Sequence, residues 1–248
     1  MNPRSRSTGL TGGDGTAAPS ISENSLIAGL PANERAEFEQ RTTRVTGSLR
    51  EILFEPNEPL KRLLFPISAM GSMLTILKDG TLLEAMTVGH EGFMGLPLFH
   101  GVSVARCRGV CQIEGEFYEL SPRDFLSLVE NAPYLRSRIH RYAQFTTEVI
   151  AQTAACNGIH LIEQRCARWL LLTADAVRRR EFSLTQELLS QMLAVRRPGV
   201  TVAIGALERQ GLIEHRYGRV SIADFEGLKK VSCECYQTIA DKARELLT

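Results

Sequence analysis

The sequence contains no long apolar run and no excess of charge of either sign. No stretch approaches the roughly 18 apolar residues of a membrane-spanning helix, and the first residues lack the apolar core of a signal peptide. We therefore expect a soluble, cytoplasmic protein with no membrane partner. Because the formal net charge is only +1, binding to nucleic acid has to depend on a local cluster of basic side chains.

Cysteine is present, but the sequence spacing of common metal sites is missing. There is no CxxC pair and no compact group of four among the six cysteines, which stand at positions 107, 111, 156, 166, 233 and 235. The segment "LKKVSCECYQTIADKARELL" predicts one helix, in which residues two apart point about 200° apart, so Cys233 and Cys235 would diverge. We expect reduced thiols, with no metal and no cofactor.

The 248 residues are enough for two domains with separate cores. Residues 1–22 are rich in Gly, Ser, Thr and Pro and have little to bury, so we expect a disordered tail. From residue 42 to 120, short apolar runs alternate with turn residues, as is typical of an antiparallel β roll or sandwich. We expect a β domain at 23–131, a helix at 132–157 and a second domain at 158–248.

A long helix is predicted between the two domains. Apolar residues and threonines recur in alternating steps of four and three from 134 to 156, which is the spacing of a coiled-coil seam. Such a seam would pair the helix with its copy in a second subunit through Leu135, Ile139, Tyr142, Thr146, Val149 and Thr153. The alternative is that this stripe packs against the β domain of its own chain.

Two short helices are predicted in "SLTQELLSQMLAVRRPGVTVAIGALERQGLI". Thr185 or Ser183 can cap the first helix, and Pro198 suits the start of the second because its fixed φ fits a first helical turn. The second helix would end near Gly211 and bury Val202, Ala203, Ala206 and Leu207. The link "AVRR" has helix-turn-helix spacing, and "LIEHRYGRVSI" adds two strands about a turn at "YG". The pattern indicates a winged helix-turn-helix domain.

Arginine is concentrated in this region, where five Arg and two Glu lie between residues 196 and 219. Arg197 is our candidate for reading a base, because a guanidinium can donate two hydrogen bonds to guanine O6 and N7. Arg196, Arg216 and Arg219 are predicted to contact phosphates. Further DNA contacts are expected from Thr185, Gln186, Gly199, Thr201 and Val202. The alternative is that these arginines only solvate a surface helix.

With β domain, long helix and winged helix in this order, the chain past about residue 25 resembles the Crp/Fnr family of bacterial transcription regulators. "LTQELLSQMLAVRRPGVTVAIGALERQGLI" is similar to the family's helix-turn-helix, "EQRCARWLLLTADAV" to the helix that leads into it, and "LLFPISAMGSM" and "VGHEGFMGLPL" to its roll. The resemblance implies an α+β fold with an N-terminal antiparallel β-roll, a long dimerisation helix and a C-terminal winged helix-turn-helix domain. It also implies a homodimer on a two-fold symmetric site in double-stranded DNA, a small-molecule or other signal received in the roll, and contact with RNA polymerase.

The sequence departs from the pattern of the family's sensor sites. Members that bind cyclic AMP carry Gly-Glu and Arg-Ser pairs where this chain has Gly95-Leu96 and, approximately, Ala105-Arg106. Leu96 offers no carboxylate for the ribose, and Arg106, displaced by one residue, would point to the opposite face of its strand. Gly95, Leu96 and Arg106 remain the effector candidates, but we expect no control by cyclic AMP. The alternative is a cyclic-nucleotide-responsive regulator with a reshaped pocket.

Three further functions fit parts of the sequence less well. Oxygen-sensing members use an N-terminal cysteine cluster, and no cysteine precedes Cys107, so we expect no iron–sulfur sensor. A cupin-like metalloenzyme needs convergent ligands, but the histidines are scattered at positions 90, 100, 140, 160 and 215. A protein-interaction module would leave Arg197 unexplained. The sequence therefore predicts a DNA-binding regulator rather than an enzyme.

Overall fold

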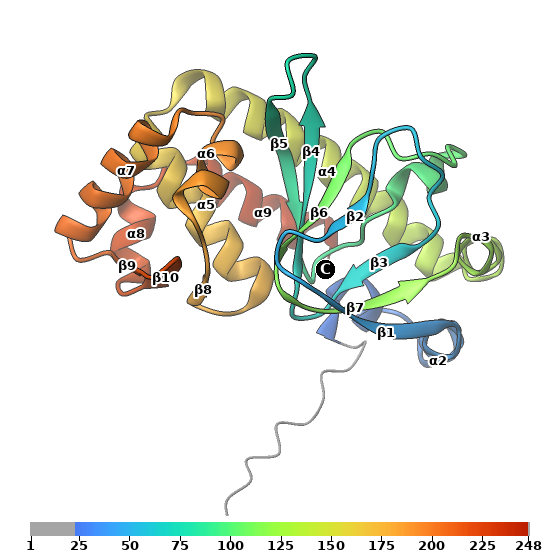
Figure 1. Ribbon diagram of the computed structural model, residues 1–248. Helices are drawn as coiled ribbons and strands as arrows, with labels where there is room; N and C mark the ends of the chain where they lie inside the picture. The colour runs from blue at the N-terminus through green and yellow to red at the C-terminus, as the bar shows by residue number, and fades with distance from the viewer. Residues whose placement is uncertain (1–22, 248) are drawn as a thin grey trace, which may run out of the picture.

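A β-rich lobe and a largely helical lobe lie side by side, and helix α4 (Pro133–Ile159) runs along both (Figure 1). The computed structural model describes residues 23–247. The tail expected at residues 1–22 lies outside the described residues. The arrangement is α+β, with the long helix between a sheet domain and a helix-turn-helix domain, which confirms the predicted fold class.

The β lobe is built from two antiparallel sheets, with strand orders β1-β7-β3 and β2-β6-β4-β5. Its strands are β1 (Thr42–Gly47), β2 (Ile52–Phe54), β3 (Leu63–Pro66), β4 (Met70–Ile76), β5 (Leu82–Val88), β6 (Arg108–Ile113) and β7 (Gly115–Leu120). Its helices are α1 (Ser25–Ala28), α2 (Ala32–Arg41), the 3-10 helix η2 (Leu96–His100) and α3 (Pro122–Asn131). Because strands β3 and β6 carry buried side chains on both faces, the sheets are covered on both sides.

Aromatic rings form the centre of this lobe. The ring of Phe65 stacks on that of Phe93 with 5.0 Å between centroids, and Phe38 meets Phe65 edge-on at 4.9 Å. Tyr142 of α4 contacts Phe93 with its ring and donates its hydroxyl to the Phe93 carbonyl at 3.1 Å. The long helix is therefore part of the core of the roll.

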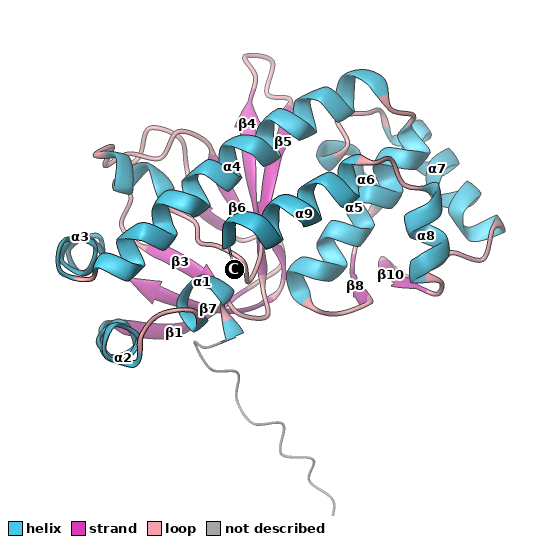
Figure 2. Cartoon of the chain, turned by 180° about the vertical axis from the view of Figure 1, so that it is seen from behind, coloured by secondary structure: helices cyan, strands magenta, loops and turns pink. Residues whose placement is uncertain are grey.

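Helix α9 (Cys235–Leu247) lies antiparallel along α4, as seen from behind the roll (Figure 2). Lys242 of α9 pairs with Glu148 of α4 at 2.9 Å. At the other end, the guanidinium of Arg138 donates to the carbonyl oxygens of Ser25, Leu26 and Leu247. These bonds join the first helix of the described chain to its last.

The stripe predicted as a dimer seam faces the interior of the single chain. Leu135, Ile139, Tyr142 and Val149 are all buried, with at most 8% of their surface exposed, and Thr146 and Thr153 are half-buried. The roll and α9 cover this face of α4, so a second copy cannot reach these side chains in this conformation. The predicted dimer seam is therefore wrong. Periodicity in the sequence identifies which face of a helix is buried, but it does not identify the element that covers this face.

The helical lobe contains a three-stranded sheet of order β8-β10-β9. Its elements are α5 (Ile162–Val177), β8 (Glu181–Ser183), α6 (Gln186–Met192), α7 (Arg197–Arg209), β9 (Ile213–Arg216), β10 (Arg219–Ile222) and α8 (Phe225–Val231). Helix α7 buries Val200, Ala203, Ile204 and Leu207. Val202, expected in the buried stripe, is instead 68% exposed, because the inward stripe of α7 is centred about 150° away from it.

The expected continuous helix at the C-terminus is wrong. Helix α8 ends at Val231 and α9 begins at Cys235, so Cys233 lies in the link between two helices. The link removes the helical geometry that would have turned the two thiols apart. Cys233 and Cys235 are both buried and lie beside Cys156 in one small cluster.

Candidate nucleic-acid interface

The turn between α6 and α7 places two arginines at the start of α7. Arg196 is the N-cap residue and Arg197 the first helical residue, and both are exposed. Pro198 follows in the first turn, where its missing N–H costs no hydrogen bond. No side chain caps this helix end within the described chain, and the Gly199 N–H bonds to the Arg196 carbonyl at 2.9 Å. The helix therefore presents the positive end of its dipole next to two cations.

The remaining residues predicted for the recognition surface lie around this helix end. Thr201 is exposed and donates its hydroxyl to the Gln186 side chain at 2.9 Å, which links α7 to the first turn of α6. Thr185 caps α6 and accepts from the Leu188 N–H. Val202 is exposed next to Thr201, while Gly199 is half-buried and a Cβ there would lie 3.2 Å from Ile162. Apart from Gly199, these residues form one surface.

The predicted turn at Tyr217 and Gly218 forms the tip of a wing. Both residues have positive φ, at 52° and 73°, and Arg216 pairs with Arg219 across the hairpin. Tyr217 is fully exposed. Arg219 is held by Glu181 of β8 at 2.8 Å, whereas Arg216 is exposed and so is available to an anion. Strand β8, which has only three residues and was not predicted from the sequence, completes the wing.

The helix-turn-helix domain is docked on the roll. Arg50, in the turn before β2, donates to Thr185 Oγ1 at 3.0 Å, and Arg179 donates to the Ser68 carbonyl at 3.1 Å. Trp169 of α5 donates its indole N–H to Glu84 of β5 at 2.9 Å. The contact between Arg50 and Thr185 means that one predicted DNA contact is also a contact with the roll.

The effector candidates from the sequence are not arranged as a pocket. Gly95 is buried with φ of +120°, and an ideal Cβ there would lie 2.9 Å from Leu63. Leu96 begins η2 and packs against the core of the roll. Arg106 is exposed to solvent, whereas Gly95 is packed in the interior.

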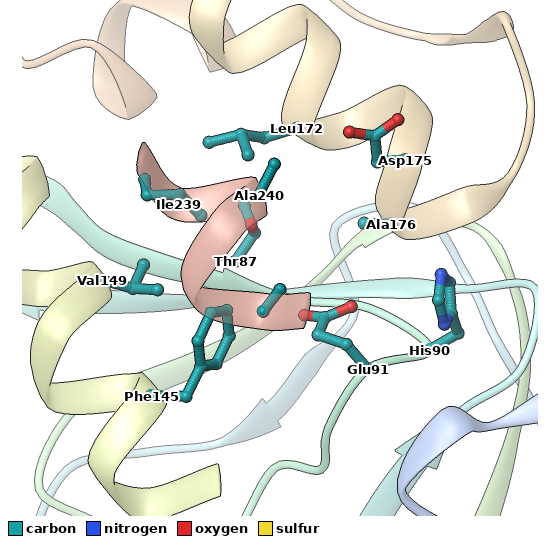
Figure 3. A pocket seen from close by; sticks show the side chains of 11 residues that line it. Thr87, His90, Glu91, Phe145, Val149, Leu172, Asp175, Ala176, Ile239 and Ala240 are labelled. Carbon is teal, nitrogen blue, oxygen red and sulfur yellow. The ribbon is translucent and has the colours of Figure 1, made fainter. Parts of the chain in front are cut away.

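A cavity of about 220 Å³ lies instead between the roll, α4, α5 and α9 (Figure 3). Its apolar wall includes Phe145, Val149, Leu172 and Ile239. Its titratable groups are His90, Glu91 and Asp175, and no described residue lining it is a lysine or arginine. The sequence alone does not predict this cavity, because its walls come from four segments far apart in the chain.

The titratable groups of the cavity are shifted toward their neutral forms. Burial raises the pKa of Glu91 and that of Asp175. Burial, together with the nearby Arg178, lowers the pKa of His90 to about 4. The Nδ1 atom of His90 lies 2.8 Å from the Ser25 hydroxyl and 3.2 Å from Arg178, which donates to it, so the neutral ring carries its proton on Nε2.

Comparison with known proteins agrees with this geometry. The family model of the Crp-like helix-turn-helix domain matches residues 164–231, which include α6, α7 and the wing hairpin. This part of the chain is therefore a Crp-like helix-turn-helix domain. A Crp-like helix-turn-helix domain is the DNA-binding part of a transcription regulator. Comparison with curated proteins found no matching sequence.

Solved structures of transcription regulators show the same fold over most of this chain. FixK2 from Bradyrhizobium japonicum matches with a TM-score of 0.66 and 13% identity, over 77% of this chain and 98% of that one. A transcriptional regulator of the CRP family from Thermus thermophilus matches with a TM-score of 0.63 and 20% identity, over 76% and 96%. The c-di-GMP-responsive global regulator CLP from Xanthomonas campestris matches with a TM-score of 0.63 and 18% identity, over 77% and 99%. None of the helices described here is long and apolar enough to cross a membrane.

Proposed function

We propose that this Crp/Fnr regulator binds a two-fold symmetric site in double-stranded DNA as a homodimer in the bacterial cytoplasm. The observation that carries the proposal is the exposed pair Arg196 and Arg197 at the uncapped N-terminus of α7. A helix end that combines the positive end of its dipole with two guanidiniums attracts the phosphate backbone and places one guanidinium in the major groove. Arg197 reads a base, and Arg196 contacts a phosphate.

The other residues predicted to contact DNA differ in how freely they can reach it. Thr201, Val202 and Gln186 belong to the outer surface of the two helices, where they can reach base edges or the sugar-phosphate backbone. Arg216 at the wing is placed for a neighbouring phosphate, and Arg219 needs to leave Glu181 to do the same. Thr185 becomes available to DNA only when Arg50 releases it.

The dimer in this proposal uses the outward face of α4. This face carries Thr147, Ile150, Ala151, Ala154, Ala155 and Gly158, all exposed. It continues to Ile159 and Leu161, which are 80% and 71% exposed. Small side chains allow two helices to approach closely, and exposed apolar residues at the end of such a stripe gain from being covered by a second copy.

Control by cyclic AMP is not part of the proposal. A cyclic phosphate loses its hydration shell when it binds, so the pocket has to supply a cation or several N–H donors in place of water. Arg106 faces solvent, and the cavity next to α4 is lined by the carboxyl groups of Glu91 and Asp175. The effector of this regulator is therefore a different small molecule or another signal. Contact with RNA polymerase is proposed from the family alone.

Selection of DNA from a random pool by the purified full chain tests the proposal. We expect enrichment of an inverted repeat whose half-sites are centred about 34 Å apart, or one helical turn. Gel-shift titration of the selected site should give a single complex containing two chains. Failure to enrich any sequence, or binding that does not discriminate the selected site from random DNA, would contradict the proposal.

A further inference from the structure

Four metal-ligating side chains converge where α4 ends and where α8 meets α9. They are Cys156, His160, Cys233 and Cys235, and one ligand atom from each lies within 4.8 Å of every other. Cys156 and His160 are four residues apart at the end of α4, so they lie on the same side of the chain. The three cysteines are buried, and the ring of His160 is partly buried.

The distances between these atoms match those between the ligands of one tetrahedral zinc ion. With Zn–S of about 2.3 Å and Zn–N of about 2.0 Å, tetrahedral geometry separates two sulfurs by about 3.8 Å and a sulfur and a nitrogen by about 3.5 Å. Here Cys156 Sγ lies 3.5 Å from Cys233 Sγ, and Cys235 Sγ lies 3.6 Å from His160 Nδ1. An iron–sulfur cluster distributes its cysteines over several irons and needs a wider set.

The second nitrogen of His160 has the partner that a metal-bound histidine requires. Its Nε2 lies 3.1 Å from the carboxylate of Glu234, the residue between Cys233 and Cys235. Such a carboxylate fixes the tautomer, so that Nε2 carries the proton and Nδ1 offers its lone pair to a metal. Gln152 donates to Cys235 Sγ at 3.0 Å, which suits a thiolate sulfur.

Two buried arginines beside the cluster supply the charge that such a site needs. Three thiolates and one divalent ion carry a net charge of −1, and burial of that charge requires a nearby cation. Arg165 interacts electrostatically with Cys156 and Cys233, and Arg168 with Cys156. These arginines are 6% and 4% exposed, and no salt bridge to a carboxylate is formed by either in the part of the chain that is described. Their Nε atoms have no hydrogen-bond partner there.

We propose that Cys156, His160, Cys233 and Cys235 bind one zinc ion as a closed tetrahedral Cys3His site. All four positions are filled by protein ligands, which is the arrangement of a structural rather than a catalytic zinc. His160 lies in the short link between α4 and α5, and Cys233 lies in the link between α8 and α9. The ion therefore fastens the end of the long helix to the helix-turn-helix domain at two of its links.

Metal analysis of the full chain, purified under reducing conditions without chelator, tests this site. We expect about one zinc per chain in the wild type, and at least a tenfold lower content in Cys233→Ser and Cys156→Ser. Cys107→Ser, at a half-buried cysteine outside the cluster, is the matched control and should retain its zinc. Equal metal content in all four proteins, or none in the wild type, would overturn the proposal.

A second measurement does not depend on the folding of the cysteine variants. The wild type, stripped of metal and kept reduced, is titrated with cobalt(II), which should give the intense visible bands of a tetrahedral thiolate site and saturate at about one ion per chain. Glu234→Gln should bind cobalt about tenfold or more weakly with the same spectrum, because it loses the carboxylate that orients His160. A spectrum typical of octahedral cobalt, or titration that ends in a Cys156–Cys233 disulfide instead, would refute the zinc site.

Discussion

Trp169 on α5 donates its indole N–H to the carboxyl group of Glu84 on β5, at 2.9 Å, and so joins the helix-turn-helix lobe to the roll. Ser72 donates to the other carboxyl oxygen at 2.6 Å. Burial raises the pKa of Glu84 to about 7, although these two donors and Arg168 act in the opposite direction. The carboxyl group at this junction therefore titrates near neutral pH.

The first prediction concerns the pH dependence of stability. The folded pKa of Glu84 lies above its unfolded value of 4.5, so its stabilising contribution is complete below pH 4.5 and is lost as the pH rises toward 7. Chemical denaturation of wild type and Glu84→Gln at a series of pH values measures this. The free energy of unfolding of the wild type relative to the variant should fall by at most about 3 kcal/mol between pH 4.5 and about pH 8. Parallel pH profiles would contradict the assignment.

The second prediction separates base reading from phosphate contact. Arg197→Ala should cost about 1–3 kcal/mol on the selected DNA site and relax the preference at one base pair of each half-site. Arg216→Ala should weaken specific and random DNA to a similar extent and reduce the salt dependence of binding. Gel-shift titrations at two salt concentrations give both quantities. Identical losses for the two variants on both kinds of DNA would refute the roles proposed for them.

The third prediction concerns the outward face of α4. The double variant Ala151→Glu, Ala154→Glu places like charges of two copies against each other and should weaken dimerisation roughly 100-fold. Ala36→Glu, on the exposed face of α2, is the control and should leave the dimer unchanged. Sedimentation velocity over a range of concentrations measures the association. A monomeric wild type, or a double variant that dimerises normally, would exclude this interface.

The fourth prediction concerns the turn between α6 and α7. Ala194 has φ of +52°, a left-handed conformation that is costly for any residue with a Cβ. Ala194→Gly should therefore stabilise the protein by about 0.5–1 kcal/mol. In contrast, Ala36→Gly within α2 should cost about 1 kcal/mol, because φ is ordinary there and glycine disfavours the helix. Thermal denaturation of both variants compares the two effects.

The fifth prediction concerns cyclic nucleotides. Calorimetric titration of the full chain with cyclic AMP and with cyclic GMP should give no binding heat, because Arg106 faces solvent and the cavity beside α4 offers carboxyl groups to an anion. DNA binding should be equal with and without either nucleotide. Micromolar binding that Arg106→Ala abolishes would establish the alternative, in which a reshaped pocket uses this arginine.

Local signals in the sequence predicted the helix-turn-helix domain well. The N-cap at Thr185, the proline in the first turn of α7 and the wing turn at Tyr217 and Gly218 each depend on a few neighbouring residues, and all three are present in the structure. The inward stripe of α7 was predicted less well. Val200 and Val202 can each be placed in a helical stripe with Ala203 and Leu207. Only the packing of α7 against α5 and α6 decides which of the two valines is buried.

Features that need distant segments could not be predicted in the same way. The apolar stripe of α4 was recognised, but its partner is α9 together with the roll, and periodicity does not name a partner. The cysteines at 156, 233 and 235 converge only because the chain breaks between α8 and α9 and α9 returns along α4. A short polar link inside an otherwise helical pattern was the available signal, and "SCE" is that link.

The guanidinium of Arg138 bonds to the main chain of α1 and to Leu247 of α9, and this contact has a consequence for how the protein is made. The part of the inner face of α4 that α9 covers leaves the ribosome about a hundred residues before α9 does. The roll is synthesised first. Its packing is complete only when α9 has been made, because α9 supplies contacts between segments that lie far apart in the sequence.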